Sequence, residues 1–86
     1  MYKVVFLKKP KKFLDSLSCD ERDKVLFKIQ ALAQNPYAKN NNVKKLDGRA
    51  EYRLRVGNIR VIYGIYNGIM TIEVVDIGFR GNIYRG

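Results

Sequence analysis

The chain has 86 residues, of which 47% are hydrophobic, so we expect one small domain over residues 1–86 with a thin core. Lys and Arg total 17 against 8 Asp and Glu, and the net charge of +9 favours polyanions such as nucleic acid or the ribosome. The chain has no His and a single cysteine, Cys19, which excludes an intramolecular disulfide and a thiolate metal cluster. We therefore expect no metal site.

The N-terminal half is predicted to form one strand followed by two helices. Residues 2–7 favour a strand, and their apolar run is too short for a signal peptide or a membrane span, so a cytoplasmic protein without membrane contact is expected. Pro10 suits the first turn of a short helix. Ser18 and Glu21 have the spacing of a capping box that begins the second helix, and Asn35-Pro36 ends it.

The C-terminal half is rich in strand signals. We predict strands at 51–56, 59–66 and 69–79, and a possible short strand or extended lead-in at 43–46. Gly57-Asn58 and Asn67-Gly68 are two-residue turn signals between these strands. The predicted fold class is α+β, a single small domain with order βααβββ. Its two N-terminal helices pack on one face of a mostly antiparallel four-stranded sheet.

These two turns predict the pairing of the last three strands. A two-residue turn at Gly57-Asn58 pairs Arg55 with Arg60, and one at Asn67-Gly68 pairs Tyr63 with Ile72 and Arg60 with Val75. Because side chains alternate along a strand, an apolar core face is expected to hold Tyr52, Leu54, Val56, Val61, Tyr63, Ile65, Ile72 and Val74. The other face is expected to hold Arg53, Arg55 and Arg60 with Ile62, Glu73 and Val75.

Clustered arginines on one sheet face indicate a phosphate-binding surface. Arg55 opposite Arg60 places like charges across two strands, which stability alone does not favour and a bound phosphate would offset. The alternative is a solvated face whose long side chains point into water. Strict alternation would turn Arg80 toward the helices, so we expect a bend or bulge at Gly78 to redirect it. Tyr84 could stack on a base or pack the tail onto the sheet.

Three segments together resemble a known family. YRLRVGNIRVIY at 52–63 resembles the "YRLRVGDYRVIY" signature of RelE-type toxins. VKKLDG at 43–48 is similar to their "KLKG" lead-in, and GFRGNIYR at 78–85 is similar to their C-terminal "GHRxxxYR". With the length and the strand order, the likeness to the RelE/ParE superfamily covers nearly the whole chain, and it is greatest to the RelE-like mRNA interferases.

The resemblance implies the toxin of a type II toxin–antitoxin system, a ribosome-dependent endoribonuclease that cleaves mRNA in the A site without metal or cofactor. The 2′-OH of the RNA attacks the phosphate and leaves a 2′,3′-cyclic phosphate. By position, Arg53 and Arg55 match residues that contact the backbone and assist proton transfer. Arg60 and Arg80 match arginines that stabilise charge on the phosphate, and Tyr84 matches the tyrosine beside the scissile nucleotides.

The resemblance also implies the partners. They are a cognate acidic, RelB-like antitoxin and the ribosome with its mRNA, while operator DNA is contacted only through the antitoxin complex. Two alternatives remain open. A ParE-like protein with the same fold inhibits DNA gyrase by binding it, and a non-catalytic toxin-fold module acts only through its partner.

The sequence departs from the family pattern at two places. Phe79 stands where His is frequent, and Arg53 and Arg55 stand where some members have Lys. Arg remains protonated at ordinary pH, so neither arginine is suited to remove a proton. Glu73 is the only carboxylate that the predicted register places near Arg60, and an ion pair that orients Arg60 is its favoured role over that of a base.

Overall fold

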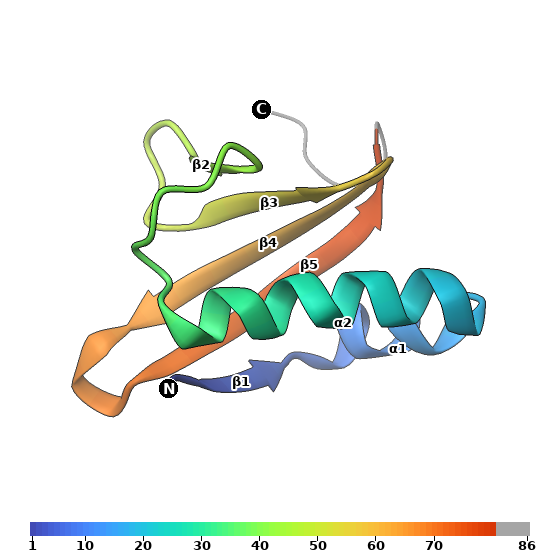
Figure 1. The fold of residues 1–86 in the computed structure, drawn as a ribbon, viewed down its shortest axis with the longest axis horizontal. Helices are drawn as coiled ribbons and strands as arrows, with labels where there is room; N and C mark the ends of the chain where they lie inside the picture. The colour runs from blue at the N-terminus through green and yellow to red at the C-terminus, as the bar shows by residue number, and fades with distance from the viewer. Residues whose placement is uncertain (81–86) are drawn as a thin grey trace.

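The structure, a computed structural model, describes residues 1–80 and confirms the predicted α+β class (Figure 1). Its elements, in chain order, are β1 (Lys3–Phe6), α1 (Lys8–Ser16), α2 (Cys19–Gln34), β2 (Val43–Lys45), β3 (Tyr52–Val56), β4 (Ile59–Tyr66), a short 3₁₀ helix (Asn67–Ile69) and β5 (Thr71–Phe79). The strands form one sheet in the order β1-β5-β4-β3-β2. Strand β1 runs parallel to β5, and the other neighbours are antiparallel.

The sheet in the described part of the chain has five strands, so the prediction of four is corrected. The segment treated as a possible strand or lead-in pairs along its whole length with β3, from Val43 opposite Leu54 to Lys45 opposite Tyr52. The pairing continues one residue further, where Arg55 N donates to the carbonyl of Asn42 at 2.8 Å. Strand β3 thereby has hydrogen-bonded neighbours on both sides.

Both helices begin where the sequence predicts. Pro10 is buried in the first turn of α1, where its missing N–H removes no helical hydrogen bond. Ser18 caps α2, because its side chain accepts from Glu21 N at 3.2 Å. The helix ends at Gln34, just before Asn35-Pro36.

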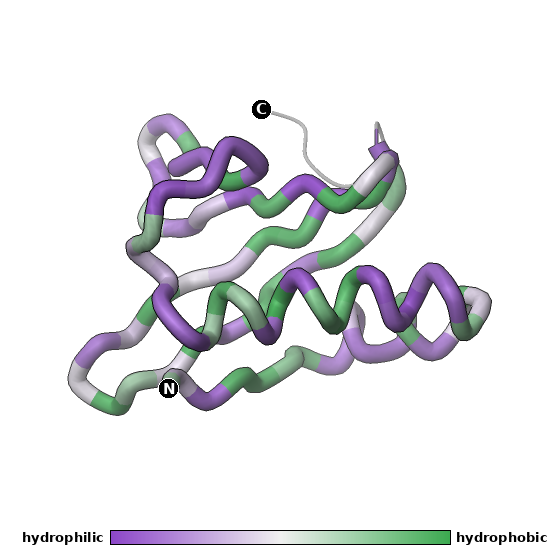
Figure 2. Tube along the Cα trace, in the orientation of Figure 1, coloured by the Kyte–Doolittle hydropathy of each residue, from purple (hydrophilic) through white to green (hydrophobic). Residues whose placement is uncertain are grey.

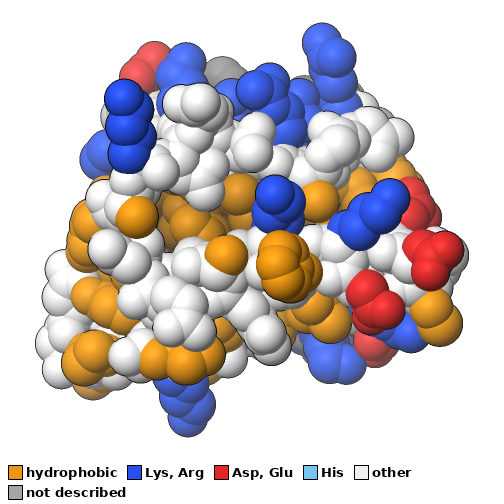
Figure 3. Space-filling model, in the orientation of Figure 1, with side chains coloured by type: hydrophobic (Ala, Val, Ile, Leu, Met, Phe, Trp, Pro, Cys, Tyr) orange, Lys and Arg blue, Asp and Glu red, His pale blue; other side chains and the backbone are white. Residues whose placement is uncertain are grey.

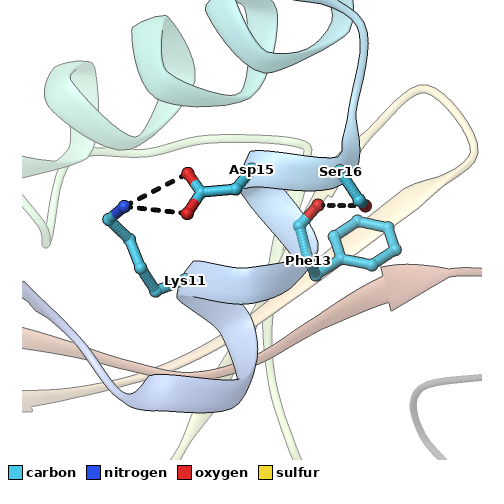
Figure 4. A network of polar contacts seen from close by, with 4 residues as sticks. All are labelled: Lys11, Phe13, Asp15 and Ser16. Atoms are coloured by element: carbon cyan, nitrogen blue, oxygen red, sulfur yellow. Dashed lines mark hydrogen bonds and ion pairs between the residues drawn. The ribbon is translucent and has the colours of Figure 1, made fainter.

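Helix α1 presents one polar side and one aromatic side (Figure 4). Lys11 Nζ lies 3.1 Å from both carboxylate oxygens of Asp15, one turn further along the helix. Ser16 Oγ donates to the carbonyl of Phe13 at 2.6 Å near the end of the helix. The ring of Phe13 packs edge-on against Phe79 at 5.2 Å between centroids, which joins α1 to the end of β5.

Both helices cover the same face of the sheet (Figure 1), and hydrophobic residues, green in Figure 2, from both layers form one buried cluster. The buried cluster contains Leu14, Leu17, Val25, Ile29, Leu32 and Ala33 from the helical segment, and Leu54, Ile59, Val61, Tyr63, Ile72, Val74 and Ile77 from the strands. Tyr52, Val56 and Ile65 pack against its margin. All eight residues predicted for the core face therefore lie on it.

The strand register was predicted correctly for the β3–β4 hairpin and wrongly for the β4–β5 hairpin. The β3–β4 pairs, from Tyr52 opposite Tyr63 to Val56 opposite Ile59, are those predicted. Gly57 has a φ of 60°, the left-handed value that a glycine supplies at the first central position of a tight hairpin turn. The predicted β4–β5 register is wrong, because Tyr63 lies opposite Val74 rather than Ile72.

The reason is a longer loop between β4 and β5. The last pair is Tyr66 with Thr71, so residues 67–70 form the connection instead of Asn67-Gly68 alone. The side chain of Asn67 is held from outside the hairpin: it accepts from Tyr2 Oη at 2.7 Å and donates to Tyr37 Oη at 2.8 Å. In this longer loop, Met70 has a left-handed φ of 45°. A two-residue turn would have placed the left-handed conformation within Asn67-Gly68.

Candidate nucleic-acid interface

Three arginines share the sheet face opposite the helices, as the alternation predicts. Arg53 and Arg55 lie on β3, and Arg55 stands directly opposite Arg60 of β4. Their strand neighbours on the other face belong to the buried core, so these side chains project away from it. We call the side of the sheet that carries Arg53, Arg55, Arg60 and Arg80 the arginine face.

Arg80 joins this face because β5 contains a bulge. The register shifts where Tyr63 pairs with Val74 and Ile62 pairs with Asp76, which leaves Val75 as the extra residue. After the bulge, Ile77 and Phe79 point to the helices, and the next residue, Arg80, returns to the arginine face. Arg80 N donates to Asn58 O at 2.7 Å, which extends the β4–β5 pairing past Phe79. A bulge was expected, but its predicted place at Gly78 is wrong.

Gly78 has a different role, because it is the cross-strand partner of Arg60. Paired residues project to the same side of a sheet, and a glycine there has no side chain to cover its partner. Arg60 Nη1 donates to the carbonyl of Gly57 at 3.4 Å, a long contact within the same hairpin. The centre of the arginine face is therefore open at Arg60.

The electrostatic environment of Arg60 shows that the arginines act on one another. Partial burial lowers the pKa of Arg60 below its usual range, and the nearby charges of Arg53, Arg55 and Arg80 lower it further, in that order. Within residues 1–80, none of the four forms an ion pair. Within this range no carboxylate is ion-paired with the positive charge gathered here, which favours binding of an anion.

The carboxylate predicted beside Arg60 lies elsewhere, so that prediction is corrected. Because of the longer loop, Glu73 stands opposite Gly64. Glu73 accepts a hydrogen bond from Tyr66 Oη at 3.3 Å, and its charge is the main reason that the pKa of Tyr66 is raised. Asp76, opposite Ile62, is the acidic residue that the bulge brings to this part of β5, and its Oδ1 accepts from Ile77 N at 3.0 Å.

Two further predictions from the family pattern concern Phe79 and Tyr84. Phe79 packs on Phe13 in the helix layer, so a His at this position would not lie on the arginine face either. Tyr84 lies outside the described residues, and its place in the site stays a prediction.

Sequence reasoning missed Lys44, which pairs with Arg53 and therefore projects to the arginine face. The signal that could have found it was the short strand of residues 43–46, which was treated as optional. Arg53 itself is half-buried, and its Nε is shielded from solvent without a hydrogen-bond partner in the described range. The hydroxyl of Tyr63, on the core face, is likewise shielded from solvent without a hydrogen-bond partner in the described range.

The outer surface agrees with a basic protein. Figure 3 shows the helix side, with Lys and Arg side chains along the margin over β2 and β3 and Asp and Glu near the start of α2. In residues 1–80, no group of three or more His, Cys, Asp or Glu side chains is placed to hold a metal ion. No helix in that range is long and apolar enough to cross a membrane.

This fold and this face define a small, basic α+β protein, and comparison with known proteins narrows the class. Residues 7–84 match the family described as the ParE toxin of the type II toxin–antitoxin system parDE. The chain therefore belongs to this family, within the RelE/ParE superfamily, and is a toxin of the type II kind. No curated protein sequence matches it at a significant level.

Solved structures of similar fold include archaeal and bacterial toxins. The RelE–RelB complex of Pyrococcus horikoshii OT3 has a chain that is 29% identical with a TM-score of 0.80, and the match covers 94% of this chain and 97% of that one. The intact Escherichia coli RelBE complex has a chain that is 21% identical with a TM-score of 0.79, and the match covers 95% of this chain and 100% of that one. The isolated E. coli RelE toxin is 19% identical with a TM-score of 0.80, and the match covers 100% of this chain and 88% of that one.

Proposed function

We propose that this toxin is a metal-independent endoribonuclease that cleaves messenger RNA held in the ribosomal A site. The observation that carries the proposal is the convergence of Arg53, Arg55, Arg60 and Arg80 on one open sheet face, without an ion-pair partner in residues 1–80. Arginine binds phosphate oxygens through paired N–H donors, and a charge already in position costs no reorganisation when negative charge develops on the phosphate.

The proposed reaction is an in-line transfer within the RNA. The 2′ oxygen forms a bond to phosphorus, the bond from phosphorus to the 5′ oxygen breaks, the 2′-OH loses its proton and the leaving 5′ oxygen gains one. Arg60 and Arg80 stabilise the phosphate oxygens, while Arg53 and Arg55 position the backbone. The guanidinium of Arg60 keeps its proton at neutral pH despite its lowered pKa. Solvent or a ribosomal group therefore takes the proton from the 2′-OH and gives one to the 5′ oxygen.

The ribosome is proposed as part of the site because the four arginines supply positive charge but stay protonated, so none of them acts as a base. An mRNA already ordered with its 2′-OH aligned avoids the entropy of orienting free RNA. We expect rapid cleavage of mRNA in isolated ribosome complexes, persistence after EDTA is added to those complexes, and 2′,3′-cyclic phosphate ends. Naked RNA cleaved equally fast, or products with 3′-hydroxyl ends, would contradict the scheme.

A second candidate function is inhibition of DNA gyrase, and it is favoured by the match to a ParE family. The two candidates differ in a direct assay. Purified toxin added to gyrase should leave supercoiling unchanged if it acts on ribosomes. Loss of supercoiling at toxin concentrations that leave translation intact would replace the first proposal with the second.

We also propose an acidic, RelB-like antitoxin as partner, with operator DNA bound only by the complex of the two. The charge of +9 favours an acidic segment, and similar toxins from P. horikoshii and E. coli are solved in complexes named RelE–RelB and RelBE. The antitoxin is expected on the arginine face or along a sheet edge. Binding that weakens with salt supports this, whereas a complex that touches neither surface contradicts it.

A further inference from the structure

A small basic hollow lies between β2 and the loop after it, next to the arginine face. It has a volume of about 80 Å³ and is lined by Lys44, Lys45, Leu46, Asp47 and Arg53. Lys44 and Arg53 are cross-strand partners, so their side chains project to the same side of the sheet from neighbouring strands. The hollow is therefore continuous with the arginine face through Arg53.

The polar groups of the hollow differ in what they already bind. Lys45 Nζ donates to the carbonyl of Arg49 at 2.7 Å, which ties that lysine to the loop. Arg53 Nε has neither solvent nor a partner in residues 1–80, and neither Arg53 nor Lys44 forms an ion pair there. A shielded donor without an acceptor is costly, and a turn of the Arg53 guanidinium toward a phosphate oxygen in the hollow would satisfy it.

We propose that Lys44 and Arg53 hold a second phosphate of the RNA strand, distinct from the scissile phosphate at Arg60 and Arg80. This inference rests on the proposed function and names Lys44 as a further substrate-binding residue. Three cationic side chains line the hollow against one carboxylate, that of Asp47. Lys binds phosphate as a point charge and Arg through its planar fork, so the pair suits a backbone phosphate better than an uncharged base.

The spacing on the sheet suits a separate phosphate. Strands β2 and β4 are two strand spacings apart, and Lys44 and Arg53 stand one row along the sheet from Arg55 and Arg60. The Cα atoms of Lys44 and Arg60 are then about 12 Å apart, so side chains that stand upright on the sheet at these two positions reach different places along an RNA backbone. An RNA strand that follows the arginines obliquely across β4, β3 and β2 would present another phosphate at the hollow.

The first test measures binding of a short single-stranded RNA that cannot be cleaved because 2′-O-methyl groups block its 2′ hydroxyls. For single strands, the slope of log affinity against log salt changes by about 0.7 for each phosphate contact. Lys44→Ala should reduce the slope by about that amount. The matched control is Lys28→Ala on the outer side of α2, which removes the same charge far from the hollow and should leave the slope unchanged. Equal slopes for the two variants would overturn the proposal.

A second test locates the phosphate. Neutral methylphosphonate is placed at each backbone position in turn, and wild-type and Lys44→Ala proteins are compared on each RNA. One non-scissile position should abolish the difference between the two proteins, because the contact is then already lost. If only the scissile position does so, Lys44 belongs to the catalytic group. If no position does so, the second site is absent.

A substitution of Asp47 should change RNA affinity in the direction opposite to that of Lys44→Ala. Asp47→Asn removes the single negative charge of the hollow, so RNA binding should become tighter at low salt, and the gain should disappear in the Lys44→Ala background if Lys44 holds the phosphate. Weaker binding by Asp47→Asn in a protein with unchanged melting temperature would count against a phosphate in this hollow.

The outcomes separate this inference from the proposed function. Normal ribosomal cleavage with a salt slope unaffected by Lys44→Ala would remove the second phosphate site and leave the nuclease. An RNA slope that depends on Lys44, in a protein that cleaves no mRNA, would retain the site and remove the nuclease. Loss of antitoxin affinity without any change in RNA binding would assign Lys44 to the protein partner and overturn the proposal.

Discussion

The two faces of the sheet show how one set of strands can serve stability on one side and binding on the other. On the helix side, Leu54 and Val61 are paired and almost fully buried. On the opposite side, the neighbouring pair Arg55 and Arg60 places two positive charges together. Successive residues of β3 thus alternate between groups that favour the folded state and groups whose repulsion opposes it. Because the difference lies only in side chains, single substitutions can separate the two roles.

The largest expected effect is on activity at the arginine face. Arg60→Ala and Arg80→Ala should each reduce mRNA cleavage by about a hundredfold to a thousandfold, the usual loss when a charge-stabilising donor is removed. The melting temperature should remain close to that of the wild type, because both side chains lie outside the buried core. Cleavage rates on isolated ribosomes measure the effect, with Lys28→Ala as the control for charge. Full toxicity of the soluble double variant would contradict the assignment.

The next effect is on stability at the helix face of the same strand. Leu54→Ala should lower the free energy of unfolding by about 2–5 kcal/mol, because it removes a buried side chain and leaves a cavity. Urea unfolding measures the loss. Folded Leu54→Ala should still bind RNA with the wild-type salt slope, since its neighbours Arg53 and Arg55 remain. A changed slope would mean that the two faces are coupled.

Tyr63 offers a smaller test within the core. Its hydroxyl is buried without a partner in residues 1–80, and this burial raises the pKa of Tyr63, so the fold holds the neutral phenol. The unfolded chain titrates near pH 10, so the stability due to neutral Tyr63 is present below that pH and is lost as the pH rises above it. Between pH 9 and 11 the wild type should lose about 1 kcal/mol more than Tyr63→Phe. Parallel losses in urea unfolding of both proteins would contradict this.

The smallest effect concerns the repulsion between paired arginines. Arg55→Thr removes a like-charge pair and adds a residue that favours strands, so stability should rise by about 0.2–1 kcal/mol. RNA binding should weaken at the same time, because a positive charge leaves the arginine face. The gain should shrink at high salt. A loss of stability at low salt would show that the Arg55 stem contributes more by packing than its charge costs.

Local signals predicted much of this molecule. Ser18 with Glu21 placed the start of α2, because a cap acts within one turn of helix. Gly57-Asn58 placed the β3–β4 register, because a glycine with positive φ suits a tight turn that few distant contacts disturb. Alternation then put Arg53, Arg55 and Arg60 on one face. None of these conclusions needed knowledge of distant contacts, and the polyanionic partner that the charge of +9 favours stays a prediction.

The tertiary structure alone decided the second hairpin and the positions of the charged residues that depend on it. Asn67-Gly68 has the composition of a tight turn, yet Tyr2 and Tyr37, distant in sequence, hold Asn67 and favour a longer loop. The shift moves Glu73 away from Arg60, and the bulge after Val74 turns Arg80 toward the arginine face. The physical reason is that a turn signal acts through the backbone preference of two residues. Side-chain hydrogen bonds and packing from other elements outweigh that preference where they converge on the same loop.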